Sequence, residues 1–437
     1  MTPLLLAACV RYNKRPLPAS TQWIAHPRNA AGRPLQRISL GTAVKRALRD
    51  NRGYAAALVK ARISVLQLRR AGLLPDPQFS ASLEKPTTPG PYVNGFSAAL
   101  SQDLSWLLTR GARKDAARAR LTQTRLQVAW QGWTLLQKTA SDYVDLWFAR
   151  RQCDLLQQQQ DRLETQQAAL DRALKRSDIT MQQDAAALTT LSQVQAQLTQ
   201  SRQARITAQA ALNSDMNLAP QVRYSLLRPK MTPLPDQQAV QSALQSLPHT
   251  RPDLLALTAG YRAANADFRA AVLAQFPGIS VDVSRNSDTS AVFSNIIGIS
   301  LNLPIFGRSR NTARLARATR DELHAVYAQR LNDASSQAQT LYARLHQTQS
   351  RQTTLRQQLP RLKQLSRNAN KAFAAGNLNG AEWSSIHQNL LARELEAMQI
   401  NATLAKGRVA LNALLGHVPL HAPIPHAPTH PESGSTP

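Results

Sequence analysis

Glycine, aromatic residues, cysteine and long apolar runs are all scarce in this 437-residue sequence. Gly occurs 17 times, aromatic residues make up 5% of the chain, and there are 2 cysteines. Such a composition disfavours an ordinary mixed α/β enzyme, favours long helices and suggests no disulfide framework. No apolar run reaches the roughly 20 residues of a transmembrane helix. Any membrane crossing must therefore use β-strands or a lipid.

Acidic residues are scarce beside basic ones, with 26 Asp and Glu against 53 Lys and Arg and a formal charge of +27. A basic chain can bind nucleic acid or an anionic membrane surface. Here the basic residues are spread along the whole chain between Gln and Ala, without a nucleic-acid motif or a compact patch containing aromatics. We therefore expect no nucleic-acid partner, and the reason for the strong charge stays open.

Patterns typical of catalysis and metal binding are missing as well. The sequence has nine His, and no metal-ligand motif joins them to Cys or acids. It has no Gly-rich phosphate loop and no nucleophile elbow. We expect a protein that is not an enzyme, with no cofactor and no metal. Residues 417–437 contain His among Pro and Ala, which favours a disordered tail over a weak metal site.

The first cysteine follows a short apolar segment, Leu4-Leu5-Leu6-Ala7-Ala8-Cys9. An apolar stretch, two small residues and Cys are typical of a bacterial lipoprotein signal that is cut before the cysteine. The usual basic n-region is missing, so the front of the signal could lie upstream. We expect residues 1–8 to be a signal remnant and Cys9 to carry lipid. The alternative is a chance cysteine at a plain N-terminus.

Four short segments recur in the same order about 200 residues apart. Residues 43–48, 77–80, 113–119 and 211–213 match residues 239–244, 277–280, 310–316 and 410–412. A period of this length exceeds that of a solenoid unit and predicts two tandem structural repeats. We place them at 36–217 and 236–416, after an extended linker at 9–35 and joined by an inter-repeat segment at 218–235.

Each repeat is predicted to start with a helix and a β-hairpin. Helical spacing of Leu and Val covers 39–70, and the matching helix covers about 236–274 with a proline break near 248–252. Apolar residues then alternate with small or polar ones, which predicts hairpins at 78–104 and 279–305. Four such strands cannot close a membrane barrel. Either the hairpins cap a soluble bundle, or three chains contribute twelve strands.

A long helical hairpin follows in each repeat. Residues 111–176 and 308–375 are almost free of Gly and Pro and would each form a rod of about 100 Å. Heptad spacing predicts coiled-coil packing for Leu156, Leu163 and Leu170, and for Leu355, Leu362 and Ala369 joined by Leu359, Leu365 and Ala372. Turns at 177–184 and 376–383 lead into return helices.

The Cys9–Leu17 start, the two helix–hairpin–helical-hairpin halves and the matching turns resemble the TolC family of outer-membrane efflux proteins. The lipoprotein branch that serves resistance-nodulation-division pumps fits best. The resemblance covers about residues 36–418, and its most specific segments are 299–306 and 373–376. It implies a mainly α fold with a small β part, in which a long α-helical coiled-coil barrel continues a twelve-stranded trimeric outer-membrane β-barrel.

The resemblance also implies a function, a location and partners. The chain would be the passive exit duct of a tripartite efflux system, carrying small molecules or metal ions from periplasm to exterior. It would lie in the cell outer membrane as a homotrimer, lipid-anchored at Cys9, with its helices in the periplasm. A periplasmic adaptor (membrane fusion) protein and an inner-membrane pump would be its partners.

A periplasmic gate and adaptor contact are implied at the two turns. The family pattern has an aromatic residue three before a Gly and acids six and nine after it. The corresponding residues here are Phe373, Gly376, Glu382 and Ser385, and in the first repeat Asp178, Gln183 and Asp184. Because Ser385 replaces an acid and Phe373 lacks a hydroxyl, we expect weaker polar links than in the family. The alternative is that the acids only stabilise helix N-termini.

Two other functions stay open. A periplasmic coiled-coil scaffold without a channel would need no barrel and no trimer. The outer-membrane component of type I protein secretion would keep the fold and change the cargo. Neither the transported substrate, the particular pump and adaptor, nor the arginines that line a tunnel can be deduced from the sequence.

Overall fold

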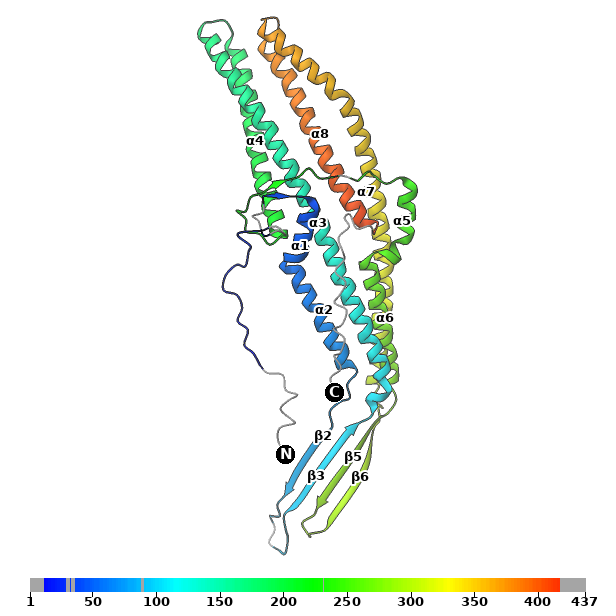
Figure 1. The fold of residues 1–437 in the computed structure, drawn as a ribbon. Helices are drawn as coiled ribbons and strands as arrows, with labels where there is room; N and C mark the ends of the chain where they lie inside the picture. The colour runs from blue at the N-terminus through cyan, green and yellow to red at the C-terminus, as the bar shows by residue number, and fades with distance from the viewer. Residues whose placement is uncertain (1–11, 29–31, 33–35, 88–89, 231, 417–437) are drawn as a thin grey trace.

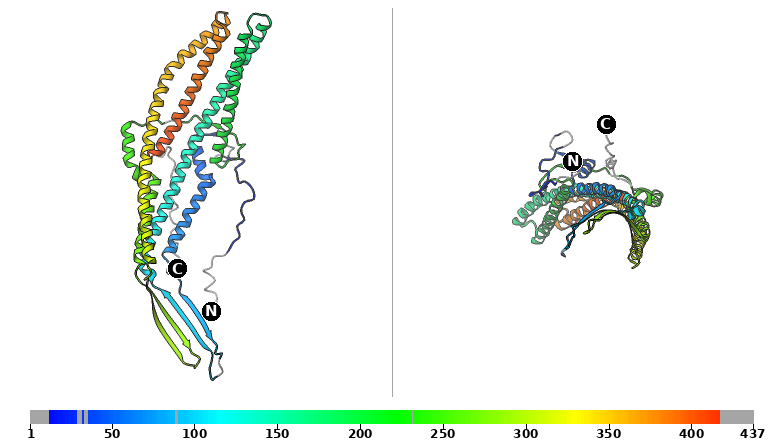
Figure 2. Two further views of the ribbon diagram at one scale, coloured as in Figure 1. Left: turned by 180° about the vertical axis from the view of Figure 1, so that it is seen from behind. Right: turned by 90° about the horizontal axis from the view of Figure 1, so that it is seen from below.

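The molecule is elongated, with strands at one end and helical turns at the other (Figure 1). This computed structural model describes residues 12–28, 32, 36–87, 90–230 and 232–416. Cys9, residues 1–8 and the 417–437 tail lie outside the described residues. Seen along its length, the chain forms a curved shell with one hollow side, not a closed bundle (Figure 2).

One four-stranded antiparallel sheet forms the strand end of the molecule. It has the order β2 (Gln78–Glu84), β3 (Gly95–Asp103), β5 (Gly278–Ser287) and β6 (Phe293–Asn302). The two hairpins meet through β3 and β5, where Phe96 faces Ser287 and Asp103 faces Ser280. β2 and β6 are the edge strands, and no other described segment of the chain pairs with the outer side of either.

Four long helices make up the rest of the shell. α3 (Ser105–Lys175) and α7 (Arg308–Ala374) have 71 and 67 residues, and each returns through a 35-residue helix, α4 (Met181–Asp215) or α8 (Gly380–Leu414). At about 1.5 Å per residue, α3 is about 105 Å long. Among the described residues, no helix combines the length and the apolar character needed to cross a membrane.

The predicted first helix is interrupted in the structure. α1 (Leu40–Asp50) and α2 (Arg52–Ala71) are separated at Asn51, which has an extended backbone and whose side chain accepts a hydrogen bond from the Tyr54 backbone N–H. The Asn51 amide also donates to the Asp215 carbonyl at the end of α4, 3.1 Å away. The prediction of one helix at 39–70 is therefore wrong at Asn51. Two contacts fix the break: Asn51 is a favoured N-cap residue and caps α2 locally, and its amide binds the end of α4.

The second half has the same order of elements. α5 (Gln237–Thr250) and α6 (Pro252–Leu273) are separated at Arg251, which donates to the Leu414 carbonyl at the end of α8. This break lies inside the predicted 248–252 region. Helix, helix, strand, strand, long helix and return helix thus occur twice, with α4 and α8 starting 199 residues apart.

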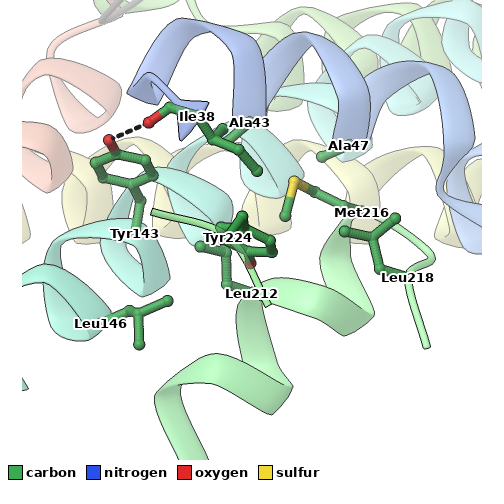
Figure 3. Packing of buried hydrophobic residues seen from close by; sticks show 9 residues of the cluster. All are labelled: Ile38, Ala43, Ala47, Tyr143, Leu146, Leu212, Met216, Leu218 and Tyr224. Atoms are coloured by element: carbon green, nitrogen blue, oxygen red, sulfur yellow. Dashed lines mark hydrogen bonds between the residues drawn. The ribbon is translucent and has the colours of Figure 1, made fainter. Parts of the chain in front are cut away.

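The buried core lies at mid-length, where the short helices meet the long ones (Figure 3). Tyr143 of α3, Leu212 and Met216 pack with Ala43 of α1, and the Tyr143 hydroxyl lies 2.8 Å from the Ile38 carbonyl oxygen. Ile38 belongs to β1 (Arg37–Ile38), which pairs in parallel with β4 (Ser225–Leu226). This core fixes the inter-repeat segment against the first repeat.

The coiled-coil seam in the second repeat differs in part from its predicted residues. Leu355 and Ala369 are buried as expected, but Leu365 is 49% exposed and Ser366 is buried instead. Together with the half-buried Leu359 and Leu362, these buried residues follow one another in alternating steps of four and three, which a heptad requires. Leu365 lies one residue off this seam, so its apolar side chain faces outward.

Candidate functional site at the helical turns

The two predicted turns lie together at the end of the molecule that is farthest from the strands (Figure 1). Gly376 lies just after α7 and has a φ of +75°. Its backbone N–H donates to the Phe373 carbonyl, and the Asn377 N–H donates to the Ala372 carbonyl. This left-handed helix end suits glycine. In the first repeat, Ser177 adopts a φ of +62°, and the backbone N–H of Asp178 donates to the Ala173 carbonyl in the same way. The two turns therefore share one geometry despite their different residues.

Each return helix starts with a side-chain cap. Asn379 accepts from the Glu382 N–H at 2.8 Å, and Thr180 forms a reciprocal capping box with Gln183. Glu382 and Gln183 therefore occupy equivalent positions, three residues after their caps. Such caps satisfy helix N–H groups that would otherwise lack partners.

The acids near the turns differ in their surroundings. Glu382 and Asp184 lie in the first turns of α8 and α4, where a negative charge stabilises the helix N-terminus. Asp184 accepts from Gln167, and Asp178 pairs with Arg176 in a solvent-exposed ion pair. Glu382 and Ser385 are exposed. Glu382 is thus exposed to a neighbouring molecule while it also stabilises the N-terminus of α8, and among the described residues it forms no ion pair.

Phe373 does not project freely from its turn. Its ring packs against Trp383 of α8, with the ring centroids 5.7 Å apart. Trp383 is almost fully buried, and its indole N–H donates to Asn370 at 2.8 Å. This tryptophan is absent from the sequence-based set of site residues, and its contact with Phe373 joins α7 to α8 beside the turn.

His387 extends this aromatic cluster one helical turn further. It stacks on Trp383 with centroids 3.9 Å apart, and its ring nitrogens lie 3.1 Å from the Ser366 hydroxyl and 3.0 Å from the Trp383 carbonyl. Burial lowers the pKa of His387, although the carbonyl contact opposes this change. The neutral imidazole is thereby favoured, with its Nδ1–H donating to the carbonyl.

Polar contacts connect the two helical hairpins beside this cluster. The hydroxyls of Thr190 (α4) and Ser384 (α8) lie 2.7 Å apart, and the Gln388 amide donates to Thr190 at 2.6 Å. Apolar side chains of all four long helices pack around these contacts. Because the contacts are buried or half-buried, the hairpins are held together within one chain. Aromatic residues are rare in this chain, so Trp383, close to the turn, could have been recognised from the sequence as a residue of the candidate site.

A cationic cleft of about 680 Å³ lies between the hairpins. Arg162 (α3) and Lys363 and Arg367 (α7) line it together with the aromatic cluster, and Lys363 pairs with Glu394 at 3.0 Å. Within the part of the chain that the structure describes, no group of three or more His, Cys, Asp or Glu could hold a metal ion. The turn end therefore combines a packed aromatic junction with exposed polar residues.

The comparisons with known proteins agree with this architecture. Residues 241–417 match the family model "Outer membrane efflux protein". The chain is similar in structure to CusC (TM-score 0.73, 18% identity, 94% of this chain and 99% of that chain). It is also similar to a membrane protein from Pseudomonas aeruginosa (TM-score 0.76, 21% identity, 94% of this chain and 97% of that chain). A third similar structure is the open-state MtrE channel of Neisseria gonorrhoeae (TM-score 0.73, 18% identity, 93% of this chain and 97% of that chain). No curated protein sequence matches the chain.

The fold is that of an outer-membrane efflux channel, mainly α with a small β part. The comparisons agree with the resemblance to the TolC family: residues 241–417 match the model of the outer membrane efflux protein family, and the fold of the solved outer-membrane channels covers nearly the whole chain.

Proposed function

We propose that this chain is one third of a trimeric outer-membrane exit duct in a tripartite efflux system. The observation that carries the proposal is the open sheet, whose edge strands β2 and β6 have no outer partner among the residues that the structure describes. Large apolar side chains on one face of this sheet, among them Phe79, Ile297 and Ile299, are more than 70% exposed. Open edges are not viable in lipid, and three copies would supply twelve strands for a closed barrel.

The proposed duct is passive and acts with partners. Three curved shells around one axis would enclose a tunnel that continues from the barrel to the helical turns. A periplasmic adaptor and a resistance-nodulation-division pump would deliver small molecules or metal ions at the turn end. The proposed gate and adaptor contact comprise Phe373, Gly376, Glu382, Ser385, Asp178, Gln183 and Asp184.

Lipidation at Cys9 is part of the proposal. The described N-terminal residues 12–28 lead from mid-length in the direction of the strands (Figure 1). A lipid attached upstream of Tyr12 would therefore be directed toward the proposed membrane.

Native mass spectrometry of the unheated, detergent-extracted protein tests the duct. We expect a trimer in which each copy carries additional acyl mass, and the Cys9→Ser variant should remain trimeric without that mass. A water-soluble monomer would contradict the duct and favour a periplasmic helical scaffold. A trimer without acyl mass would contradict lipidation alone.

The gate is tested by the Glu382→Ala variant in a planar bilayer. If each of three copies loses an exposed polar link of about 0.5 kcal/mol, the ratio of closed to open gates falls by about tenfold. We therefore expect higher conductance. Glu322→Ala, an exposed acid of α7 away from the turns, is the matched control. Unchanged conductance in Glu382→Ala would remove Glu382 from the gate.

A further inference from the structure

The two faces of the four-stranded sheet differ in the sign of their charges as well as in polarity. The strand register places Glu84, Asp103 and Asp282 on one face, whose other residues are mostly Ser, Gly and Asn, with Gln78, Ala99 and Ile296 among them. The four strands contain one basic residue, Arg285, which lies on the opposite, apolar face with its guanidinium over the Phe293 ring. The polar face of the strands therefore carries carboxylates and no cation, in a chain with a formal charge of +27.

The three carboxylates occupy different levels along the strands. Asp103 ends β3 and accepts hydrogen bonds from the backbone and side chain of Ser105, so it shapes the junction with α3. Glu84 ends β2 beside the hairpin loop and faces Gly95. Asp282 lies inside β5, between Ser101 on β3 and Gly298 on β6. Asp282 is therefore the acid that lies well inside the sheet.

The neighbours of Asp282 do not neutralise the negative charge of its carboxylate. A β-carbon at Gly298 would collide with that carboxylate, which therefore lies across the glycine. One carboxylate oxygen is 3.3 Å from the Ser300 hydroxyl, which can donate to it. No lysine, arginine or histidine among the described residues forms an ion pair with Asp282. The equivalent position in the first repeat is Ser82, 200 residues earlier, so each chain contributes one such acid.

We propose that Asp282 makes the exit of the duct selective for cations. The inference rests on the proposed function, because the polar face lines a lumen only if three copies close the barrel. Three Asp282 carboxylates would then form a ring at one level. Walls of low dielectric focus the field of such charges and raise the local concentration of cations, and acidic rings select cations in other pores. Cationic and neutral solutes would pass this exit more readily than anions.

Reversal potentials in a planar bilayer with a tenfold KCl gradient test the proposal. The unmodified trimer is expected to favour K⁺ over Cl⁻, Asp282→Asn to lower that permeability ratio severalfold, and Asp282→Lys to favour Cl⁻. Ser284→Asn is the control, because it introduces the same neutral side chain two residues along the same face without removing a charge. An unchanged ratio in both Asp282 variants would overturn the proposal.

Cysteine labelling gives a local readout that does not depend on the helical entrance. In a Ser284→Cys background, a cationic methanethiosulfonate reagent should react faster than an anionic one, and adding Asp282→Asn should remove most of that difference. Equal rates with Asp282 present would contradict the proposed cation selectivity and would not affect the proposed duct. A protein that is neither trimeric nor conducting would instead contradict the proposed function.

Discussion

Replacing Asp253 with alanine is expected to lower the free energy of unfolding by about 3–5 kcal/mol, because it leaves a buried guanidinium without its counter-charge. Arg251 is fully buried and forms two hydrogen bonds with Asp253, of 3.0 and 2.7 Å. Arg330 of α7 binds the same carboxylate at 2.7 Å, and both guanidinium groups lie over Trp130 of α3. This group joins α3, α6 and α7.

Denaturant unfolding of the detergent-solubilised protein, followed by circular dichroism and tryptophan fluorescence, measures the effect. Asp145→Ala is the control, since Asp145 pairs with Lys406 at 2.8 Å in a partly exposed ion pair. Exposed pairs of this kind contribute about 0–1 kcal/mol. Similar losses in the two variants would contradict the special role of the buried group.

The same carboxylate gives the expected pH dependence. Burial opposes ionisation of Asp253, but the paired guanidinium groups outweigh it and lower its pKa below the ordinary value of 3.8. The unfolded chain therefore takes up the proton first as the pH falls. The stability that Asp253 contributes is present above its unfolded pKa and is lost as the pH falls through its lower folded pKa. The Asp253→Ala variant should lack this component of acid sensitivity.

Trp383→Ala is the second change with a large expected effect. Removing a buried tryptophan leaves a cavity and costs about 3–5 kcal/mol. The loss would be local, because Trp383 lies at the turn end, remote from the mid-length core, and stability varies along an elongated structure. Phe373, Asn370 and His387 would lose their contacts with the indole. We expect the turn end of α7 and α8 to open more often.

Hydrogen exchange followed by mass spectrometry measures this opening by peptide. Peptides covering residues 360–395 should lose more than a hundredfold of protection, since a hundredfold corresponds to about 2.8 kcal/mol, while the mid-length core stays protected. Trp23→Ala is the control, because Trp23 is 53% exposed. Unchanged exchange at the turn end would show that the aromatic cluster does not hold the two helices together.

The helices and strands follow from local periodicity in the sequence. The alternating residues Phe79, Ala81 and Leu83 all lie on the same face only if the segment is a β-strand. Apolar residues at helical spacing, in stretches with little proline, share one face only in a helix. Strand ends were less predictable. β6 stops at Asn302, short of the predicted 305, and Pro304 just beyond it cannot donate a strand hydrogen bond.

The turns of the candidate site were also predictable, but their surroundings were not. The left-handed end at Gly376 and the cap at Asn379 are local features of the chain. The contact of Thr190 with Ser384, residues 194 apart in the sequence, depends on how the two helical hairpins are rotated against each other. No local pattern contains that rotation.

The sequence by itself determined the repeated order of helices and strands, the two turns and the alternation of the strands, because these depend on neighbours within a few residues. Only the tertiary structure decided that the side chains of Asn51 and Arg251, at the two helix breaks, reach the carbonyls of Asp215 and Leu414. It also decided that Asp282 lies across Gly298, since that contact depends on the register between β5 and β6. Such contacts join residues that the chain keeps far apart, so their energies enter only when the elements pack together.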